Sequence, residues 1–509
     1  MENNQDTKAL CLPSVVLDTV AEQLADVDLT LPDYCPDIEK ILKCKLCPKL
    51  QSKSLSGGQL QIDGYCVVTV LYVEGEKKSI RCCEQTVSFS QSFTLRETPD
   101  DPVIITSTKP EYINCRALSP RRLVMHGAFS LYAKVLGCSR TALYSPDDEQ
   151  LEARTAKVRC ANLKSLCQEQ FSVYEEISTA DKPPVEALLY TSLDASVTDS
   201  KAVTGKLMIN GELDLRLFYL SDIQTGETAK LDYILPFSQI IDCEGIDEET
   251  VNLISVELMS YDVRLKNDML SDSPSLSVEA KLCITEQGYI LSDEEIVTDA
   301  YSVKNASSPC FEQLSLTEAA APVSESFIEK LSVKVDDGRL LKILDIFPDS
   351  VTADCTPFSG GINVSGKINM CLLALGENNV PVFIERSFEY THALASAADL
   401  NTLIYPKARV SSVSYRLADD NTAELRCELR FTAGALKNES IRAVSDIDIF
   451  EDKPITGDSC ALTLYFASRG ESLWDIAKAH NTRLERLISE NSADSITLGE
   501  PQMLLIPGI

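Results

Sequence analysis

The chain has 509 residues, of which 44% are hydrophobic and 24% are charged, a balance typical of folded globular protein. Acidic residues number 77 and basic residues 47, so the formal net charge is −30, which repels phosphate backbones and anionic lipid. Nucleic acid is therefore excluded as an expected partner. A run of about 18 apolar residues is absent, which excludes a transmembrane helix.

The N-terminus does not resemble a signal peptide. Pro13 interrupts the apolar patch from Ala9 to Leu17, and the basic start of a signal peptide is missing. We therefore expect no export and a cytoplasmic location. The eighteen cysteines are dispersed with irregular spacing, so in a reducing compartment we expect all of them to be free thiols.

Three segments of the chain align with one another. Each begins with a short block, "PDIEKIL", "PPVEALL" or "GRLLKIL", which precedes a second block with a central glycine by the same distance. The central glycines are Gly64, Gly211 and Gly366. Their offsets are 147 (211 minus 64) and 155 (366 minus 211), and periods of this length indicate tandem domains.

Alternating apolar and polar residues follow each glycine, and this period of two predicts a half-buried β-strand. Further alternating segments, separated by Gly, Pro, Asn and Asp clusters, predict antiparallel sandwich-like or barrel-like domains. The short blocks place apolar residues three and four apart, which predicts one or two helical turns that plug one end of each sheet. Linkers are expected near residues 145–159, 317–326 and 450–459.

The last 48 residues follow a different pattern. Residues 462–467 predict a strand, and Ser472 occupies an N-cap position before an apolar stripe. Thr482 and Glu485 have the spacing of a capping box at the start of a second helix. A closing strand is expected from Met503.

Strand, helix, helix and strand in "YFASRGESLWDIAKAHNTRLERLISEN…LLIP" resemble the LysM family. The resemblance implies a two-stranded sheet carrying two helices, with a sugar groove between two loops. The implied groove residues are Gly470, Glu471, Ser472 and Leu473 in the first loop and Asp494, Ser495, Ile496 and Thr497 in the second. The sequence departs from the family where Glu500 and Pro501 stand between Gly499 and Gln502, which puts one wall of the groove in doubt.

Four further residues of this segment are candidates for packing or for partner contact. Trp474, the only tryptophan of the chain, is expected to anchor helix to sheet through its large apolar area, with direct ligand contact as the alternative. Arg469, Arg483 and Arg486 are candidate interface residues because arginine often anchors interfaces.

"LPDYCPDIEKIL", followed by a strand with a central glycine, resembles the start of the SPOCS domain of spore-forming Clostridia and other Firmicutes. SPOCS domains followed by one LysM are the layout of the SipL family. The implied domains are three SPOCS-like units at residues 1–155, 156–316 and 317–449 and a LysM domain at residues 462–509. The implied fold is mainly β: three tandem antiparallel β-sandwich or barrel-like domains with short helices, and a small α+β LysM domain.

The resemblance implies a non-enzymatic scaffold of endospore coat assembly. Such a protein lies in the mother-cell cytoplasm and tethers the coat to the forespore surface, with a coat morphogenetic ATPase bound through the LysM domain and other coat proteins as partners. The alternative is a peptidoglycan-binding protein of the cell wall or spore cortex, whose LysM domain binds glycan containing N-acetylglucosamine.

A hydrolase with unrecognised catalytic residues is a third hypothesis. Few residues support it, because His126, His392 and His480 lie in different segments and the chain has no G-x-x-x-x-G-K-[ST], H-E-x-x-H or G-x-S-x-G motif. The C-x-x-C of Cys44 and Cys47 supplies half of a usual structural zinc site. We therefore expect no catalytic residues, no metal and no cofactor.

Overall fold

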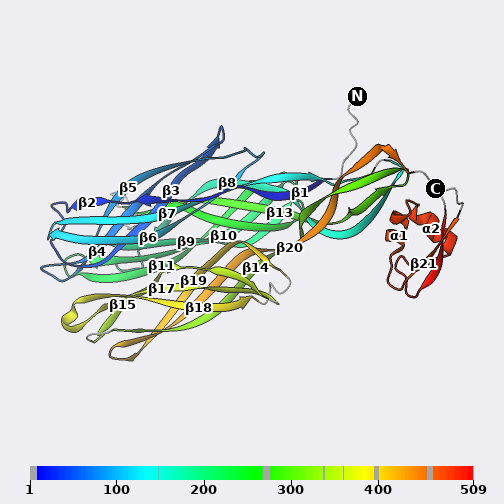
Figure 1. Cartoon of the computed structure of the whole chain (residues 1–509). Coiled ribbons are helices and arrows are strands. Elements are labelled where there is room, and N and C mark those ends of the chain that lie inside the picture. Colours follow the sequence, from blue (N-terminus) through cyan, green and yellow to red (C-terminus); the bar gives the residue numbers. More distant parts are fainter. Residues whose placement is uncertain are drawn as a thin grey trace.

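The computed structural model describes residues 9–146, 148–266, 275–335, 339–358, 360–394, 400–455 and 462–507. Most of this chain is β-strand, arranged in antiparallel sheets, and both α-helices lie in a small α+β module near the C-terminus (Figure 1). Neither helix of the described chain has the length or the apolar character needed to span a bilayer. The predicted mainly β fold is confirmed, and the described sheets form open sandwiches without a closed barrel.

Repeat 1 is a two-layer sandwich. Its strands are β1 (Ala9–Leu24), β2 (Val27–Thr30), β3 (Ile38–Ser56), β4 (Gln59–Glu74), β5 (Ile80–Thr94), β6 (Val103–Ser119) and β7 (Arg122–Ala142). One sheet has the order β1-β7-β2 with β6 also paired to β7, and the other has the order β3-β4-β5. Apolar residues that alternate along these strands, such as Val68 and Phe129, form the core between the two sheets.

Repeat 2 contains one strand fewer. Its strands are β8 (Leu151–Ser178), β9 (Ala187–Val203), β10 (Lys206–Asp222), β11 (Glu227–Asp242), β12 (Val251–Lys266) and β13 (Ser275–Ser302). They form the sheets β12-β13-β8 and β11-β10-β9.

Repeat 3 follows the same plan. In its second sheet, however, two short strands take the place of the single first strand of the other repeats. Its elements are β14 (Asn305–Lys334), β15 (Lys342–Val351), β16 (Asp354–Phe358), β17 (Gly361–Leu375), η1 (Glu377–Asn379), β18 (Pro381–Leu394), β19 (Thr402–Asp419) and β20 (Thr422–Pro454). The sheets are β14-β20-β19 and β15-β17-β16, with β18 also paired to β17.

The three central glycines occupy equivalent positions, which confirms the predicted repetition. Each lies in the middle strand of a meander and pairs with an aromatic residue of the next strand: Gly64 with Phe89, Gly211 with Phe237 and Gly366 with Tyr390. A Cβ at Gly64 would lie 2.3 Å from the carbonyl oxygen of Lys49 and 2.6 Å from the Phe89 ring. Only glycine therefore allows the backbone and the ring to approach this closely.

The predicted helical turns are wrong. "PDIEKIL" begins β3, "PPVEALL" leads into β9, and the described part of "GRLLKIL" leads into β15, with Gly338 outside the described residues. Register shifts between Ile38 and Lys40 and between Ile41 and Lys43 explain the misleading spacing. Each β-bulge adds a residue to the strand, so apolar side chains three apart lie on one face without a helix.

The linker predicted at residues 317–326 is also wrong, because the whole segment belongs to β14. The linkers predicted at residues 145–159 and 450–459 are strand in part, and residues 147 and 456–459 lie outside the described chain. The predicted domain divisions after residues 155, 316 and 449 remain predictions, and each falls inside a strand.

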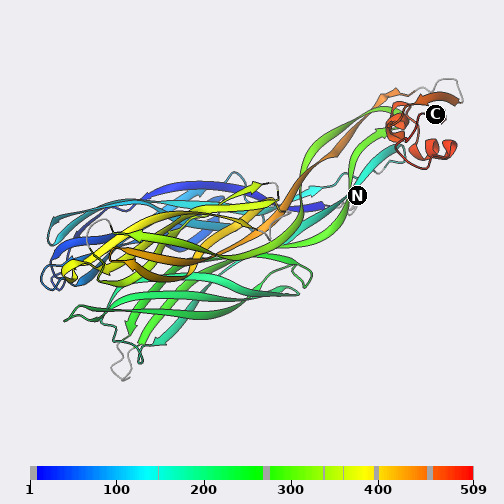
Figure 2. The same ribbon diagram turned by 90° about the horizontal axis from the view of Figure 1, so that it is seen from below.

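Four strands continue past the sandwiches and form an arm. The arm consists of residues 151–160 of β8, 293–302 of β13, 305–316 of β14 and 439–454 of β20. Its two antiparallel pairs pack against each other through buried side chains that include Val297, Ala300 and Val444. Figure 2 shows the arm projecting from the sandwiches and the module lying at its tip.

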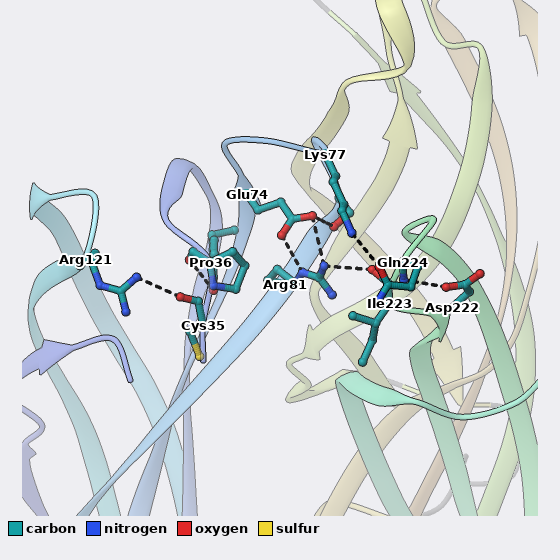
Figure 3. Close-up of polar contacts among 11 residues, drawn as sticks. Cys35, Pro36, Glu74, Lys77, Arg81, Arg121, Asp222, Ile223 and Gln224 are labelled. Carbon is teal, nitrogen blue, oxygen red and sulfur yellow. Dashed lines mark hydrogen bonds and ion pairs between the residues drawn. The ribbon is translucent and has the colours of Figure 1, made fainter. Parts of the chain in front are cut away.

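Repeats 1 and 2 contact each other through equivalent hairpin turns. Arg81 donates two hydrogen bonds to the Glu74 carboxylate, at 3.0 and 3.1 Å, and a third to the carbonyl of Ile223 at 3.2 Å (Figure 3). Lys77 Nζ lies 3.2 Å from Gln224 Oε1 in the same contact. The β4–β5 turn of repeat 1 is thereby held against the β10–β11 turn of repeat 2.

All three repeats meet around a cavity of ≈ 250 Å³. Lys45 of repeat 1 pairs with Asp349 of repeat 3 at 2.7 Å, and Lys43 lies 3.5 Å from the same carboxylate. Tyr190 of repeat 2 stacks on Phe347 of repeat 3 with ring centroids 4.5 Å apart. Each repeat thus contributes at least one side chain to the junction.

The prediction that all eighteen cysteines are free is wrong. Disulfides join Cys11 to Cys138 and Cys167 to Cys243, across 127 and 76 residues of sequence. Thirteen other cysteines of the described chain are unpaired, and Cys460 lies outside it. Antiparallel pairing of β1 with β7 brings Cys11 and Cys138 together, and the linear spacing of cysteines carries no signal of this.

Replacement of a central glycine tests the packing of the meander. We expect Gly64→Ala to lower the free energy of unfolding by about 1–3 kcal/mol, because the new methyl group overlaps backbone that cannot move aside. Gly75→Ala is the matched control, since a Cβ there meets nothing within 4 Å. Urea unfolding followed by circular dichroism measures both, and equal stabilities would contradict the packing argument.

A buried carboxyl makes stability depend on pH. Glu286 of β13 is fully buried, and burial raises its pKa to about 7 although Ser165 donates a hydrogen bond to it. In the unfolded chain the pKa of this carboxyl is near 4.5. Its contribution to the free energy of unfolding is therefore fully present below about pH 4.5, and about 3 kcal/mol of it is lost as the pH rises to about 7.

We expect Glu286→Gln, which stays neutral, to remove this part of the pH dependence. The exposed Glu279 on the same strand provides the control, Glu279→Gln. Urea unfolding at about pH 5 and about pH 8 measures the effect. Identical pH slopes in the wild type and in Glu286→Gln would show that this carboxyl has an ordinary pKa.

Candidate functional site

The C-terminal module has the predicted order of elements: β21 (Leu462–Ala467), α1 (Leu473–Ala479), α2 (Leu484–Asn491) and β22 (Gln502–Pro507). Its strands pair antiparallel and its helices pack on one face of the sheet, around a core that includes Leu473, Leu487 and Leu504. Ser472 is the N-cap of α1 as predicted, and its Oγ accepts a hydrogen bond from the Trp474 backbone N–H at 3.2 Å.

The predicted capping box of the second helix is wrong. α2 begins at Leu484 with Arg483 as its N-cap, and no side chain caps it. Thr482 is buried instead, and its carbonyl accepts a hydrogen bond from the Tyr301 hydroxyl at 2.8 Å. Thr482 therefore contacts the arm and does not cap α2.

The two loops predicted to form a groove lie side by side. The Leu473 N–H donates to the Ile496 carbonyl at 2.8 Å, and the Gly470 N–H donates to the Leu498 carbonyl at 2.8 Å. A third bond runs from Leu498 to the Glu471 carbonyl at 3.0 Å. The first loop is thus fixed to the second by backbone hydrogen bonds.

Side chains of these loops differ in their access to solvent. Leu473 is fully buried and belongs to the core, and Glu471 accepts a hydrogen bond from the Tyr465 hydroxyl at 3.2 Å. The second loop is open along its length: Asp494, Ser495, Ile496 and Thr497 are all exposed. The side chains placed to meet a ligand are therefore mainly those of the second loop, and ligand binding there remains a prediction.

Trp474 packs between the module and the arm. Only 1% of the residue is exposed, and its ring meets that of Tyr301 edge to face at 5.1 Å between centroids. The indole Nε1 donates to Asp299 Oδ2 at 2.8 Å. Trp474 is therefore buried, and it anchors α1 to the arm as well as packing in the core of its own module.

Asp299 is the centre of this contact. Its other oxygen, Oδ1, accepts a hydrogen bond from Lys478 Nζ at 2.6 Å. Burial acts to raise the pKa of Asp299, but the hydrogen bonds from Lys478 and Trp474 outweigh burial and hold the pKa below its ordinary value. The carboxylate is therefore ionised at neutral pH, and both donors come from one face of α1 because they are four residues apart.

Arg483, a candidate interface residue, takes part in the same contact. Arg483 donates to the Glu149 carbonyl at 2.9 Å, beside the tip of the arm. Arg469 and Arg486 are exposed. The region that holds the module therefore uses side chains of α1 and the N-cap residue of α2.

Two family models match segments of the chain. Residues 468–507 match the LysM domain, and residues 37–118 and 184–266 match the family described as SipL, SPOCS domain. The chain therefore contains two segments similar to the SipL SPOCS domain, followed by a C-terminal LysM domain. No curated protein and no solved structure matched it.

The SPOCS matches correspond to equivalent strands. They span β3 to β6 in repeat 1 and β9 to β12 in repeat 2, which are the three meander strands and the first return strand. Repeat 3 has the same strand order in β15 to β19. The matched families are binding and scaffold domains.

The LysM sheet also has an apolar outer face, which the sequence analysis missed. Leu462, Leu464, Phe466 and Met503 are 47%, 58%, 78% and 52% exposed. Phe466 pairs with Met503 across the two strands, and Leu464 pairs with the half-buried Leu505. The signal was present in "LTLYFA", where the solvent positions of a half-buried strand hold leucine and phenylalanine in place of polar residues.

The cysteines and carboxylates of the chain were also considered as metal ligands. Cys44 and Cys47 are three residues apart within β3, so their side chains point to opposite faces and cannot bind one ion together. Two groups in the described chain bring donor atoms close enough: Cys167, Cys243 and Glu286, and Asp349, Cys371 and Glu385. The first group has its thiols in a disulfide, and the second is bonded to Lys43 and Lys45.

Because the chain has one tryptophan, its fluorescence reports the contact between α1 and the arm. We expect Asp299→Ala to shift Trp474 emission to longer wavelength and to increase quenching by acrylamide, because Lys478 and the indole lose a buried acceptor. The cost is about 3 kcal/mol of docking free energy. Asp293→Ala, at an exposed position of the same strand, is the control. Unchanged emission in Asp299→Ala would refute the role of this carboxylate.

Proposed function

We propose that this protein is a non-enzymatic scaffold of endospore coat assembly, which tethers the coat to the forespore surface by binding a coat morphogenetic ATPase through its LysM domain. The order of SPOCS and LysM domains supports the sporulation role. The observation that carries the partner proposal is the apolar outer face of the LysM sheet, where Phe466 is 78% exposed.

The geometry favours a protein partner for this face. A flat apolar sheet surface offers few polar groups to a sugar, whereas exposed aromatic and methionine side chains are enriched at protein interfaces. The face remains exposed while α1 is bonded to the arm, so one domain has a surface for its own chain and a second surface for a partner. The SPOCS repeats then supply surfaces for other coat proteins.

Catalysis has little support in the arrangement of side chains. His126 lies beside Asp26, His392 stacks on Phe327, and His480 packs against Tyr465. These three contacts lie in repeat 1, repeat 3 and the LysM domain, so no single domain contains a pair of histidines. We therefore propose that the protein is not an enzyme.

Glycan binding is the alternative function. It is favoured by the exposed second loop, Asp494 to Thr497, which lies beside the first loop as a LysM groove requires. A LysM domain that binds N-acetylglucosamine-containing glycan would place the protein at the wall or the spore cortex.

We propose the mother-cell cytoplasm at the forespore surface as the location, because that is where an ATPase-bound coat scaffold acts. The two disulfides argue against this placement, since disulfides are rare in reducing compartments. A fluorescent fusion in sporulating cells distinguishes this location from the wall or the spore cortex. A ring around the forespore supports the mother-cell location, and its absence contradicts it.

Substitution at the sheet face tests the partner proposal. We expect Phe466→Ser in the full chain to weaken binding of the purified coat morphogenetic ATPase by about thirtyfold, which is typical for loss of a central aromatic anchor. Biolayer interferometry measures the affinity. Ile234→Ser, at an exposed apolar position of repeat 2, is the control and should bind like the wild type.

The alternative is tested in the same preparation with Ile496→Ser, which changes the exposed loop and leaves the sheet face intact. Retained ATPase binding by Ile496→Ser, together with its loss in Phe466→Ser, supports the scaffold. ATPase binding that is unchanged in Phe466→Ser, or tight binding of muropeptides without any ATPase binding, would refute it.

A further inference from the structure

A second inter-repeat cavity lies far from the LysM domain in the fold. Its volume is ≈ 280 Å³, and its walls come from β9 and β12 of repeat 2 and from β14, β19 and β20 of repeat 3. Small-molecule sites are often found at such domain junctions, and this volume is just below their usual range.

Three cationic side chains line the cavity from the repeat 3 side. Arg409 of β19 stands directly opposite Arg430 of β20 in the antiparallel register, and Lys407 lies two residues before Arg409. Like charges in directly opposed positions destabilise a sheet. Negative charge close to this pair would therefore stabilise the arrangement.

Repeat 2 supplies only part of that charge. Asp194 accepts a hydrogen bond from Lys407 at 2.8 Å, and Asp214 pairs with Arg409. Arg430 makes no hydrogen bond or ion pair with any residue that the structure describes. Asp199 also lines the cavity, but its side chain is exposed to solvent.

Two uncharged groups in the lining also lack partners. Ser196 is 9% exposed, and its Oγ has no hydrogen-bond partner among the described residues. Asn252 is half-buried, and its Oδ1 is likewise unpartnered within the described chain. An unmade hydrogen bond at a buried polar atom costs free energy, so such atoms usually have a partner that the protein alone does not supply.

We propose that this cavity binds a small molecule that carries an oxyanion group, a carboxylate or a phosphate, together with a hydroxyl or amino donor. The Arg430 guanidinium binds the oxyanion, and the negative charge of the oxyanion neutralises the second positive charge of the opposed arginine pair. Ser196 Oγ donates to the same oxyanion, and Asn252 Oδ1 accepts from the donor group of the ligand. Water alone fills the space without removing the excess positive charge.

The binding test uses the full-length protein with inorganic phosphate and with malonate, each at millimolar concentration. We expect at least one probe to raise the thermal unfolding midpoint and to give saturable heat in isothermal titration calorimetry. Arg430→Gln should weaken that binding by about tenfold or more, because a charge-assisted hydrogen bond is lost. Ser196→Ala should weaken it by a smaller factor.

Arg426→Gln is the matched control, since Arg426 is an exposed arginine on the same strand and does not line the cavity. It should bind the probes like the wild type. A response to one probe alone identifies the oxyanion as phosphate or carboxylate. Absence of stabilisation by both probes, or equal affinity in the wild type and Arg430→Gln, would overturn the proposal.

Discussion

The Asp299 carboxylate fixes the position of the LysM domain on the rest of the protein. It accepts hydrogen bonds from Trp474 and Lys478, which lie 175 and 179 residues further along the chain. A buried carboxylate is stable only when donors compensate for its lost hydration, and α1 supplies both donors from one face. These two hydrogen bonds decide which surface of the LysM domain faces the arm. The apolar sheet face remains exposed.

The arm transmits that position to the SPOCS repeats. β13 runs without a break from the core of repeat 2, where Leu282 is fully buried, to Asp299 near the tip. β14 and β20 do the same for repeat 3, and both pairs share buried side chains along the arm (Figure 2). The LysM domain is therefore held at the end of a continuous β structure.

Charged side chains that do not belong to the apolar cores gather at the junctions between repeats. Each sandwich has an apolar core of its own. Charged side chains gather where the sandwiches meet, as with Lys45 and Asp349 in one junction and Arg409 and Arg430 in another. The first group is compensated by carboxylates of the chain, whereas Arg430 in the second has no hydrogen-bond or ion-pair partner among the described residues. Ligand binding at such a junction would stabilise one arrangement of the repeats.

Local patterns in the sequence determined the strands, the equivalence of Gly64, Gly211 and Gly366, the two LysM strands and the Ser472 cap, because each depends on residues within a few positions. Only the tertiary structure decided the rest. It showed "PDIEKIL" to be a bulged strand, joined Cys11 to Cys138, and placed Trp474 against Asp299. These features depend on pairing between segments more than 70 residues apart, or on a neighbour that imposes a bulge. Sequence periodicity records which face of a strand is buried, but not which distant element buries it.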